Sequence, residues 1–477
     1  MTIKVYSSET RAKIDLETNE PGKVAMYVCG PTVYDSCHIG HARPAVVFDT
    51  IRRYLEYAGL VVTFISNITD IDDKIINRSH ELGISWRDLA RRYQDEYEQD
   101  MAALGVLSPS IRPRATEHIP EMIALIQGLV DKGVAYATPK GVWFDVTKFP
   151  EYGRLSGRTN DDENTEHRVE QDEEKKNPQD FALWKTAKPG EPFWDSPWGQ
   201  GRPGWHIECS AMSGKYCNFQ LDIHGGGADL AFPHHENELA QSEAFTGKRF
   251  VRNWLHNGFI TVGKTDGAEE EEGEKMGKSK GNAFWLRDAF KVASPAALRL
   301  WILGTHYRMP LLYKPELITQ ADNALDRIFN CLEALARVLA DAGDVAPDSG
   351  KTANAVAEAE KQFRDAMNDD FNTPQALAAV YEAVNRINAG LKENAPAAEL
   401  KAARNLLASM LGVLGLPLER QTSGGGGVDG LVELLLDLRG DARKNKDFAL
   451  SDRIRDGLKD LGIEINDRGG ESTWVKK

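Results

Sequence analysis

The sequence predicts an α/β fold, in which a doubly wound parallel sheet carries an inserted domain and is followed by an α-helical bundle and a small C-terminal α+β unit. Two observations predict this class. Apolar strand-like runs alternate with helical patterns through the first half of the 477 residues, and after about Ser294 the strands are expected to stop. A chain of this length has room for two to four domains.

Apolar runs predict the strands of the parallel sheet. They span residues 23–30, 60–70, 219–227 and 250–260. Between the first two, residues 39–59 show helical periodicity that ends at a glycine. This order of strand, helix and strand is typical of an open α/β sheet, whose ligands bind beyond the carboxyl ends of the strands.

The pattern changes between Ala115 and about Gly204, where a helix, a strand and a long polar stretch indicate an insertion in the sheet domain. Further along, four Ala/Leu-rich amphipathic segments predict the bundle, and a stretch rich in Pro, Gly and Ser predicts a flexible linker over 417–430. The expected parts are 1–114 and 205–293 (two halves of the sheet domain), 115–204 (inserted domain), 294–315 (junction), 316–418 (bundle) and 428–477 (C-terminal unit).

The composition is that of an ordinary globular chain, with 41% hydrophobic and 27% charged residues. No apolar run approaches the 18 residues of a membrane span, and the N-terminus has no signal-peptide pattern, so we expect a cytoplasmic protein that does not contact a membrane. Five cysteines without a secretory signal indicate reduced thiols. The net charge of −14 argues against a broad basic surface but not against a local one.

The stretch AFPHHENELAQ places two histidines and two glutamates at a predicted helix start. His234 and Glu238 are four residues apart and share a face, whereas His235 points elsewhere, so the metalloprotease pattern H-E-x-x-H is absent. A solvated helix is the commoner outcome for such a stretch. The alternative is half of a metal site, which Cys29 and Cys209 would complete as a Cys₂HisGlu zinc set, although their wide spacing is a weak signal.

Other histidines and cysteines receive ordinary roles. We expect His235 and His256 to make hydrogen bonds beside the site, and we expect Cys37, Cys217 and Cys331 to be plain thiols.

Two further segments suggest phosphate binding. In CGPTVYDSCHIGHARPA, His38 and His41 flank Gly40 at a helix start, where backbone N–H groups and the helix dipole favour anions. In EKMGKSKGN, two lysines stand among small residues, so the segment is either a solvated loop or a lysine clamp on phosphates. Glu272 stands where a P-loop needs glycine.

The same loop contains G-x-S-x-G, and HGGG lies upstream, as in lipase-type hydrolases. We reject this interpretation because a glutamate run, not a buried strand, precedes the serine.

Taken in order along nearly the whole chain, these motifs resemble the cysteinyl-tRNA synthetases, a family of class I aminoacyl-tRNA synthetases. The resemblance rests on CGPTVYDSCHIGHARPAVVFDTIRRYL, NITDIDDKI, NPQDFALWK, PGWHIECSAM, LDIHGGGADLAFPHHENELAQSEA, KMGKSKGN, ALRLWILGTHYR, DDFNTPQAL and ALSDRIRDGLKDLGIEINDRGGESTW. The HIGH signature is His38 to His41, and KMSKS appears as Lys275 to Ser279 with Gly277 in place of serine. The acidic stretch Glu269–Glu274 looks like a lineage-specific insertion.

The resemblance implies a Rossmann-like catalytic domain with an inserted connective domain, a stem-contact junction, a tRNA-binding bundle and a C-terminal anticodon-binding unit. It implies that the chain activates L-cysteine with ATP, releasing pyrophosphate, and transfers cysteine to the 3′ end of tRNA(Cys). We expect a monomer with one Zn²⁺ per chain and Mg²⁺ accompanying ATP. For the C-terminal unit two interpretations stay open. Charge alone slightly favours an ordinary mixed surface, and the alternative is that Trp474, Arg443, Lys444 and Lys446 contact the anticodon loop.

The resemblance also assigns roles to residues. The implied metal ligands are Cys29, Cys209, His234 and Glu238. The implied ATP-binding residues are His38, Gly40, His41, Gly227, Asp229, Lys275, Lys278 and Ser279, of which the two histidines and two lysines are catalytic. The implied cysteine pocket includes Gly30, Thr69 and Trp205, and zinc would bind the substrate thiolate and so discriminate against serine.

Two alternatives stay open. One is a related ATP-dependent ligase that joins cysteine to an amino sugar in thiol biosynthesis, against which the bundle and the 428–477 unit weigh. The other is a zinc-stabilised RNA-binding protein without catalysis, against which the paired histidines and lysines weigh.

Overall fold

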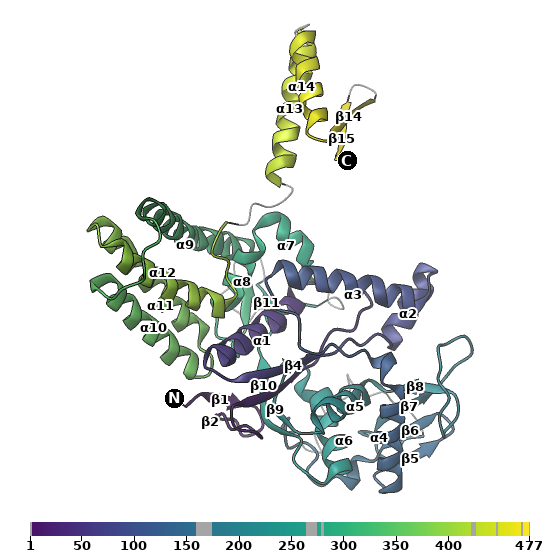
Figure 1. Ribbon diagram of the computed structural model, residues 1–477. Helices are drawn as coiled ribbons and strands as arrows, with labels where there is room; N and C mark the ends of the chain where they lie inside the picture. The colour runs from purple at the N-terminus through teal and green to yellow at the C-terminus, as the bar shows by residue number, and fades with distance from the viewer. Residues whose placement is uncertain are drawn as a thin grey trace. The chain divides into compact units, whose positions relative to one another are not determined.

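The computed structural model describes residues 2–158, 174–263, 274–277, 281–420, 426–444, 447–468 and 471–476. These residues form two units, Met1–Leu418 and Glu419–Lys477 (Figure 1). In the described part of the chain, no helix is long and apolar enough to cross a membrane.

The first unit is built on a four-stranded parallel sheet with the order β10-β9-β3-β4. Its central strand β3 pairs Met26 with Phe64 of β4 and with Ile223 of β9. The strands span β3 (Lys23–Val28), β4 (Val61–Ser66), β9 (Leu221–Gly227) and β10 (Val251–Asn257). The predicted parallel sheet is confirmed, with each strand shorter than the apolar run that predicted it.

Helices cover both faces of this sheet. Successive strand residues point to opposite faces, so neighbouring residues of β3 show what packs on each side. Met26 and Val28 belong to a core that includes α1 (Ile39–Tyr57), whereas Tyr27 between them packs with Cys209 and Leu239. Those two residues lie on α5 (Trp205–Cys217) and α6 (Glu236–Thr246). The sheet is therefore doubly wound, as the sequence predicted.

Two further helices and a short hairpin complete this part of the unit. The hairpin consists of β1 (Lys4–Ser7) and β2 (Ala12–Asp15), and the helices are α2 (Asp73–Leu82) and α3 (Trp86–Ala103).

An antiparallel sheet with the order β5-β6-β7-β8 lies between β4 and α5 in the sequence and packs with α4 around its own core. Its elements are α4 (Ile119–Asp131), β5 (Ala135–Thr138), β6 (Gly141–Phe144), β7 (Phe181–Thr186) and β8 (Gly201–Pro203).

The carboxylate of Asp73 on α2 forms ion pairs with two residues of this antiparallel sheet. Asp73 accepts from Lys185 at 3.1 Å and from Arg202. Burial alone raises the pKa of Asp73, but the two cations outweigh burial and lower it below the usual value of 3.8.

Strands do not stop at Ser294 as the sequence pattern suggested, which corrects that expectation. β13 (Leu311–Tyr313) pairs with β11 (Ile260–Val262), and β11 also pairs with β12 (Glu274–Lys275). A three-residue strand is too short to give a period-2 pattern, so the helical residues around it hid it. Between β12 and β13 lie α7 (Leu286–Val292) and α8 (Pro295–Leu303).

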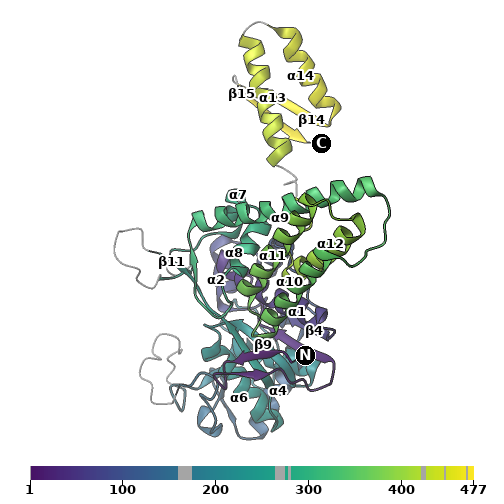
Figure 2. The ribbon, with the colours of Figure 1, turned by 90° about the vertical axis from the view of Figure 1, so that its left-hand side faces the viewer.

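The bundle packs four helices against one another and against α1 and α8 (Figure 2). They are α9 (Pro315–Ala342), α10 (Lys351–Asn368), α11 (Thr373–Lys392) and α12 (Ala397–Leu414).

Between α10 and α11, the buried carboxylate of Asp370 joins three segments. It accepts from the Tyr6 backbone N–H at 2.8 Å, from the Tyr307 hydroxyl at 2.8 Å and from Arg308 at 2.7 Å. The N-terminal hairpin, the segment before β13 and the bundle therefore share one acceptor.

The second unit has a small core of Val432, Leu458 and Ile463. Its elements are α13 (Gly426–Lys444), α14 (Phe448–Asp460), β14 (Ile463–Arg468) and β15 (Glu471–Lys476). Helix α13 begins at Gly426, inside the stretch predicted as a linker over 417–430, so the linker is shorter than predicted. Residues 421–425 and Lys446 lie outside the described residues. Trp474 packs partly against the small core rather than standing free.

Candidate active site

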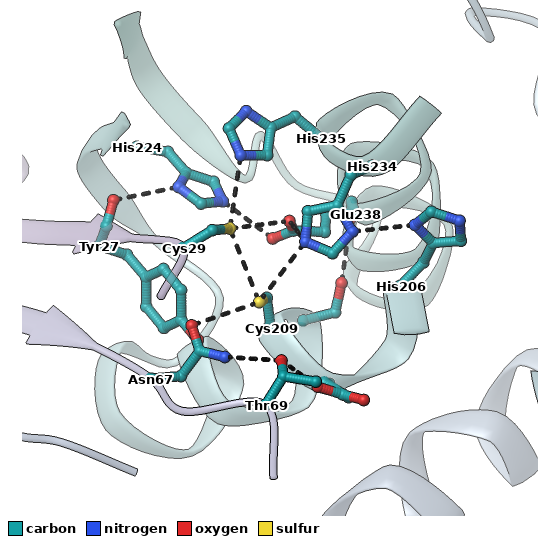
Figure 3. A network of polar contacts seen from close by, with 12 residues as sticks. Tyr27, Cys29, Asn67, Thr69, His206, Cys209, His224, His234, His235 and Glu238 are labelled. Carbon is teal, nitrogen blue, oxygen red and sulfur yellow. Dashed lines mark hydrogen bonds and ion pairs between the residues drawn. The ribbon is translucent and has the colours of Figure 1, made fainter. Parts of the chain in front are cut away.

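Four side chains with metal-ligand chemistry meet at the carboxyl end of β3 (Figure 3). Cys29 follows β3 and Cys209 lies on α5. His234 lies in the turn Ala231–His235 that precedes α6, and Glu238 lies in the first turn of α6. The two Sγ atoms are 3.7 Å apart, and His234 Nε2 lies 3.7 Å from Cys209 Sγ and 3.0 Å from Glu238 Oε1. The set whose members lie far apart in sequence is therefore brought together in space.

The chemistry and spacing of these four groups fit zinc. Zn–S and Zn–N bonds of about 2.3 and 2.0 Å place ligand atoms of a tetrahedron roughly 3.3 to 3.8 Å apart. The S–S separation of 3.7 Å and the 3.4 Å between Cys29 Sγ and Glu238 Oε1 lie within that range, and the His234–Glu238 separation is slightly shorter. Thiolate, imidazole and carboxylate are the usual donors to this metal.

The charges of the cluster also suit a cation. Burial raises the pKa of Cys29 well above its usual value, and the charges of Cys209 and Glu238 raise it further. Burial acts the same way on Cys209, but a hydrogen bond from Cys29 and the nearby His234 lower its pKa to about 6. Burial disfavours the Glu238 carboxylate, yet His224 and His234 hold its pKa well below the usual range. Deprotonating both thiols would leave three anions in one buried site, which a divalent cation would neutralise.

The helix carrying His234 starts differently from the prediction. Residues Ala231–His235 form a separate π-type turn with a cis Phe232–Pro233 peptide, and regular α-helix begins only at Glu236. Pro233 therefore precedes the helix instead of occupying its first turn, because Phe232 adopts an extended backbone.

Further histidines face the cluster. His235 makes a hydrogen bond beside the site, as predicted, because its Nδ1 lies 2.8 Å from His256. It does not point away from the cluster, however, since its Nε2 lies 3.4 Å from Cys29 Sγ. His224, which was not singled out, places Nε2 2.8 Å from Glu238 Oε2 and Nδ1 3.1 Å from the Tyr27 carbonyl. Cys29, His224, His235 and Glu238 thus form a second group of potential ligands that shares two members with the first.

The remaining polar residues of PHHENE hold a neighbouring segment, Glu151–Arg158. The buried Glu236 carboxylate accepts from the backbone N–H groups of Gly153 at 2.9 Å and Ser156 at 2.8 Å. Asn237 accepts from the Tyr152 hydroxyl at 2.5 Å. One side of the helix start thus faces the cluster while the other is fixed by this segment, a division that no local sequence pattern signals.

The histidines of α1 have a defined tautomer. His38 is the N-cap, and its Nδ1 accepts from the Gly40 backbone N–H at 3.0 Å, while His41 Nδ1 accepts from the His38 N–H at 3.2 Å. A ring nitrogen that accepts carries no proton, so each neutral imidazole is protonated at Nε2. A Cβ on Gly40 would lie 2.5 Å from the His38 ring, which explains the glycine.

Lys275 lies on β12 with its ammonium 2.9 Å from Asp229 and 4.2 Å from the centre of the Phe259 ring. The Asn282 side chain accepts from the Gly277 N–H at 2.8 Å and donates to the Lys275 carbonyl at 3.2 Å. Lys278 and Ser279 lie outside the described residues.

A cavity of about 890 Å³ connects these groups. Its walls include His38, Gly40, His41, Gly227, Asp229, Lys275, Cys29, Gly30 and Trp205. Gly30 is required where it stands, because a Cβ there would lie 1.6 Å from the Asn67 carbonyl oxygen. Trp205 stacks on His234 with ring centres 4.1 Å apart. Thr69 is not part of the wall: it is buried and donates to Glu208 at 2.8 Å.

Two family models match parts of the chain. A family model described as tRNA synthetases class I (C) catalytic domain matches residues 15–323, and one for the DALR domain matches residues 362–419. The cysteine–tRNA ligase of Desulfitobacterium hafniense is 48% identical over the full length of both chains. The chain belongs to the cysteine–tRNA ligase family. A relative of the same name from Thermococcus onnurineus is 47% identical over 100% of this chain and 99% of its own.

Solved structures agree on the fold. Methionyl-tRNA synthetase of Mycobacterium tuberculosis, bound to methionyl-adenylate, superposes with a TM-score of 0.59 over 82% of this chain and 89% of its own. A leucyl-tRNA synthetase ternary complex from Agrobacterium radiobacter gives 0.60 over 84% and 85%. Their identities of 15% and 12% limit this likeness to the fold.

Proposed function

We propose that this member of the family activates L-cysteine with ATP, forming cysteinyl-adenylate and pyrophosphate, and then transfers cysteine to the 3′ end of tRNA(Cys). The observation that carries the proposal is that one cavity opens on both the ligand-type cluster around Cys29 and the paired histidines of α1. A thiol-selective pocket and a phosphate-binding helix start thus adjoin one another, as an adenylate-forming reaction of cysteine requires.

In this proposal Cys29, Cys209, His234 and Glu238 hold zinc. When bound, the metal supplies a soft Lewis acid that takes a thiolate in preference to a neutral hydroxyl, and so separates cysteine from serine. Shape alone separates substrates of such similar size by only about 10- to 200-fold. Gly30 and Trp205 would form the adjoining wall against the rest of the amino acid.

His38 and His41 act on the phosphates. Both rings present Nε2–H as a donor, and the start of α1 adds the positive end of its dipole. As the cysteine carboxylate attacks the α-phosphorus, negative charge grows on the phosphate oxygens, and donors fixed before the reaction stabilise it without reorganising. The capping hydrogen bonds supply that fixation.

Lys275 and Lys278 neutralise the departing pyrophosphate, with Mg²⁺ bound to ATP. Lys275 forms an ion pair with Asp229 that is about one-third exposed and therefore weak. Exchanging Asp229 for a phosphate costs little, so the lysine can move to the substrate. A ribose hydroxyl of the terminal adenosine of the tRNA then attacks the adenylate carbonyl, AMP leaves, and no enzyme nucleophile is needed.

Pyrophosphate exchange measured with each of the twenty amino acids tests the first step. Exchange with cysteine alone is the expected result, and absence of cysteine-dependent exchange would overturn the proposal in favour of a non-catalytic RNA-binding protein. Offering the adenylate either tRNA or an amino sugar tests the second step. Transfer to the sugar and not to tRNA would identify the thiol-biosynthesis ligase instead.

A further inference from the structure

Arg43 lies on α1 two residues after His41, and its guanidinium is buried, with the residue 1% exposed. It donates to the carbonyl of Phe259 at 2.6 Å, to that of Tyr307 at 3.3 Å and to that of Met309. One side chain of the histidine helix thus holds two separate segments by their backbones.

This arginine has no carboxylate partner among the ion pairs of the described residues, which is unusual for a buried guanidinium. Burial lowers its pKa to about 10, so it remains charged at neutral pH. Arg299, the other fully buried arginine in contact with α1, is instead paired with Asp49. Arg43 also lines the cavity, so its uncompensated charge lies beside the place proposed for the polyanionic nucleotide.

The Phe259 carbonyl lies next to the paired strands β11 and β12, and β12 carries Lys275. Phe259 directly precedes β11, which pairs Thr261 with Lys275, and the Met276 N–H donates to Ile260 at 2.9 Å. The Phe259 ring also lies under the Lys275 ammonium at 4.2 Å. A shift of Phe259 would therefore move Lys275 with it.

The other two carbonyls fix the neighbouring side of the same small sheet. Tyr307 accepts from the Gly258 N–H at 2.8 Å, and Met309 lies so close to Gly258 that a Cβ there would stand 2.5 Å from its carbonyl oxygen. The planar fork of one guanidinium reaches all three acceptors at once, which the single ammonium of lysine does not match.

We propose that Arg43 is a positioning residue for cysteine activation. By holding the Phe259 carbonyl, it sets the distance between the histidines at the start of α1 and Lys275 on the neighbouring strand β12. The proposal rests on the adenylate-forming reaction given above. Arg43 does not touch the reacting atoms in this scheme. It acts through Lys275, and displacement of a catalytic group by about 1 Å can cost roughly 100-fold in rate.

A double-mutant cycle in the full-length protein distinguishes positioning from a general structural role. The variants are Arg43→Lys, Lys275→Ala and both together, and the readout is the single-turnover rate of adenylate formation with cysteine and ATP. We expect Arg43→Lys alone to slow adenylation by about 10- to 100-fold, and we expect it to slow the Lys275→Ala protein by less than about threefold. Cysteine affinity, measured by calorimetry, should stay within about twofold of the unmodified protein, because no contact to the cysteine pocket is removed.

Arg299→Lys is the matched control. Arg299 is also buried and donates to backbone carbonyls, those of Leu414 and Leu104, but it does not contact the segments that carry Lys275. Any loss it causes should multiply with that of Lys275→Ala, because the two sites share no partner. If Arg43→Lys does not fold, Arg43→Gln enters the same cycle.

Multiplicative effects of Arg43 and Lys275, or a loss of cysteine affinity equal to the loss of rate, would overturn the positioning role. Unchanged adenylation in Arg43→Lys would overturn it as well. Failure of the proposed function is a different result, since it would appear as absence of cysteine-dependent exchange in the unmodified protein.

Discussion

Replacing Cys209 by serine tests which of the two overlapping groups of ligands holds the metal. Cys209 belongs only to the group with His234, and His235 belongs only to the group with His224. Cys209→Ser replaces a buried thiol beside Cys29, and His235→Ala removes a buried imidazole beside it, so each substitution alters one group alone. We expect Cys209→Ser to lose zinc and His235→Ala to retain it.

The size of the effect follows from the number of donors. Structural zinc sites contribute about 10 to 16 kcal/mol, so each of four ligands accounts for roughly 2.5 to 4 kcal/mol, or about 60- to 700-fold in affinity. A hydroxyl at position 209 stays neutral where the thiol, with a pKa of about 6, is ionised at pH 7. Removal of His235 takes away an imidazole 3.4 Å from Cys29 Sγ, and the loss of such a supporting group typically costs about 10- to 100-fold.

The assay is zinc content by mass spectrometry after dialysis against a chelator of graded strength. With Co²⁺ in place of zinc, a sulfur-to-metal charge-transfer band should intensify when cysteine is added and not when serine is added. Circular dichroism of each variant shows that it is folded. Retention of zinc by Cys209→Ser together with its loss from His235→Ala would refute the assignment and move the metal to the group that contains His224.

Three further predictions concern the loop, the second unit and acid stability. Lys275→Ala should slow adenylation by about 30- to 1,000-fold, because its contact to phosphate is worth roughly 2 to 4 kcal/mol in the transition state. Gly277→Ser should be nearly neutral, since a Cβ there meets no atom within 4 Å. Equal single-turnover rates for the two variants would contradict this prediction. Deleting residues 419–477 should leave cysteine-dependent pyrophosphate exchange nearly intact and strongly reduce tRNA charging, and a folded truncation that has lost exchange would show that the unit serves activation as well. Asp73→Asn should lower the free energy of unfolding by less than about 1 kcal/mol at pH 7, because the carboxylate is 45% exposed. Since the folded-state pKa of Asp73 is lowered, its stabilisation is present above the unfolded pKa near 4 and is lost as pH falls through the lower, folded-state value. Urea titrations of the two proteins should therefore differ at neutral pH and converge at acid pH.

The architecture could be predicted from the sequence because burial imposes periodicity. Strands such as β3 and helices such as α1 leave period-2 or period-3.6 patterns, and a glycine marks the end of α1 at Gly59. The three-residue strand β13 leaves no such pattern. The start of α6 was misplaced because a proline usually indicates a first helical turn, whereas here Phe232, directly before Pro233, has an extended backbone.

The candidate site was predictable to the extent that its residues have distinctive chemistry. Cys29, Cys209, His234 and Glu238 could be grouped by donor type, and the structure brings them within reach of one another. The supporting residues could not be found this way. His224 was visible only as part of HGGG, and nothing local in the sequence distinguishes a histidine that faces a carboxylate from one that packs in a core.

The same limit applies to Glu236 and Arg43. Their partners lie about 80 and more than 200 residues away, and these contacts are set by the packing of whole elements. Groups that carry chemistry are therefore easier to predict from one sequence than the groups that hold them in place.

The carboxylate of Asp370 has a consequence for RNA recognition. Because it is shared by the N-terminal hairpin, the segment before β13 and the turn between α10 and α11, the bundle is oriented against the catalytic sheet when the chain folds. A tRNA that contacts the bundle would meet a surface already aligned with the cavity. The entropy cost of aligning the bundle with the cavity is then met during folding and not during binding. This cost therefore does not reduce the affinity for the RNA.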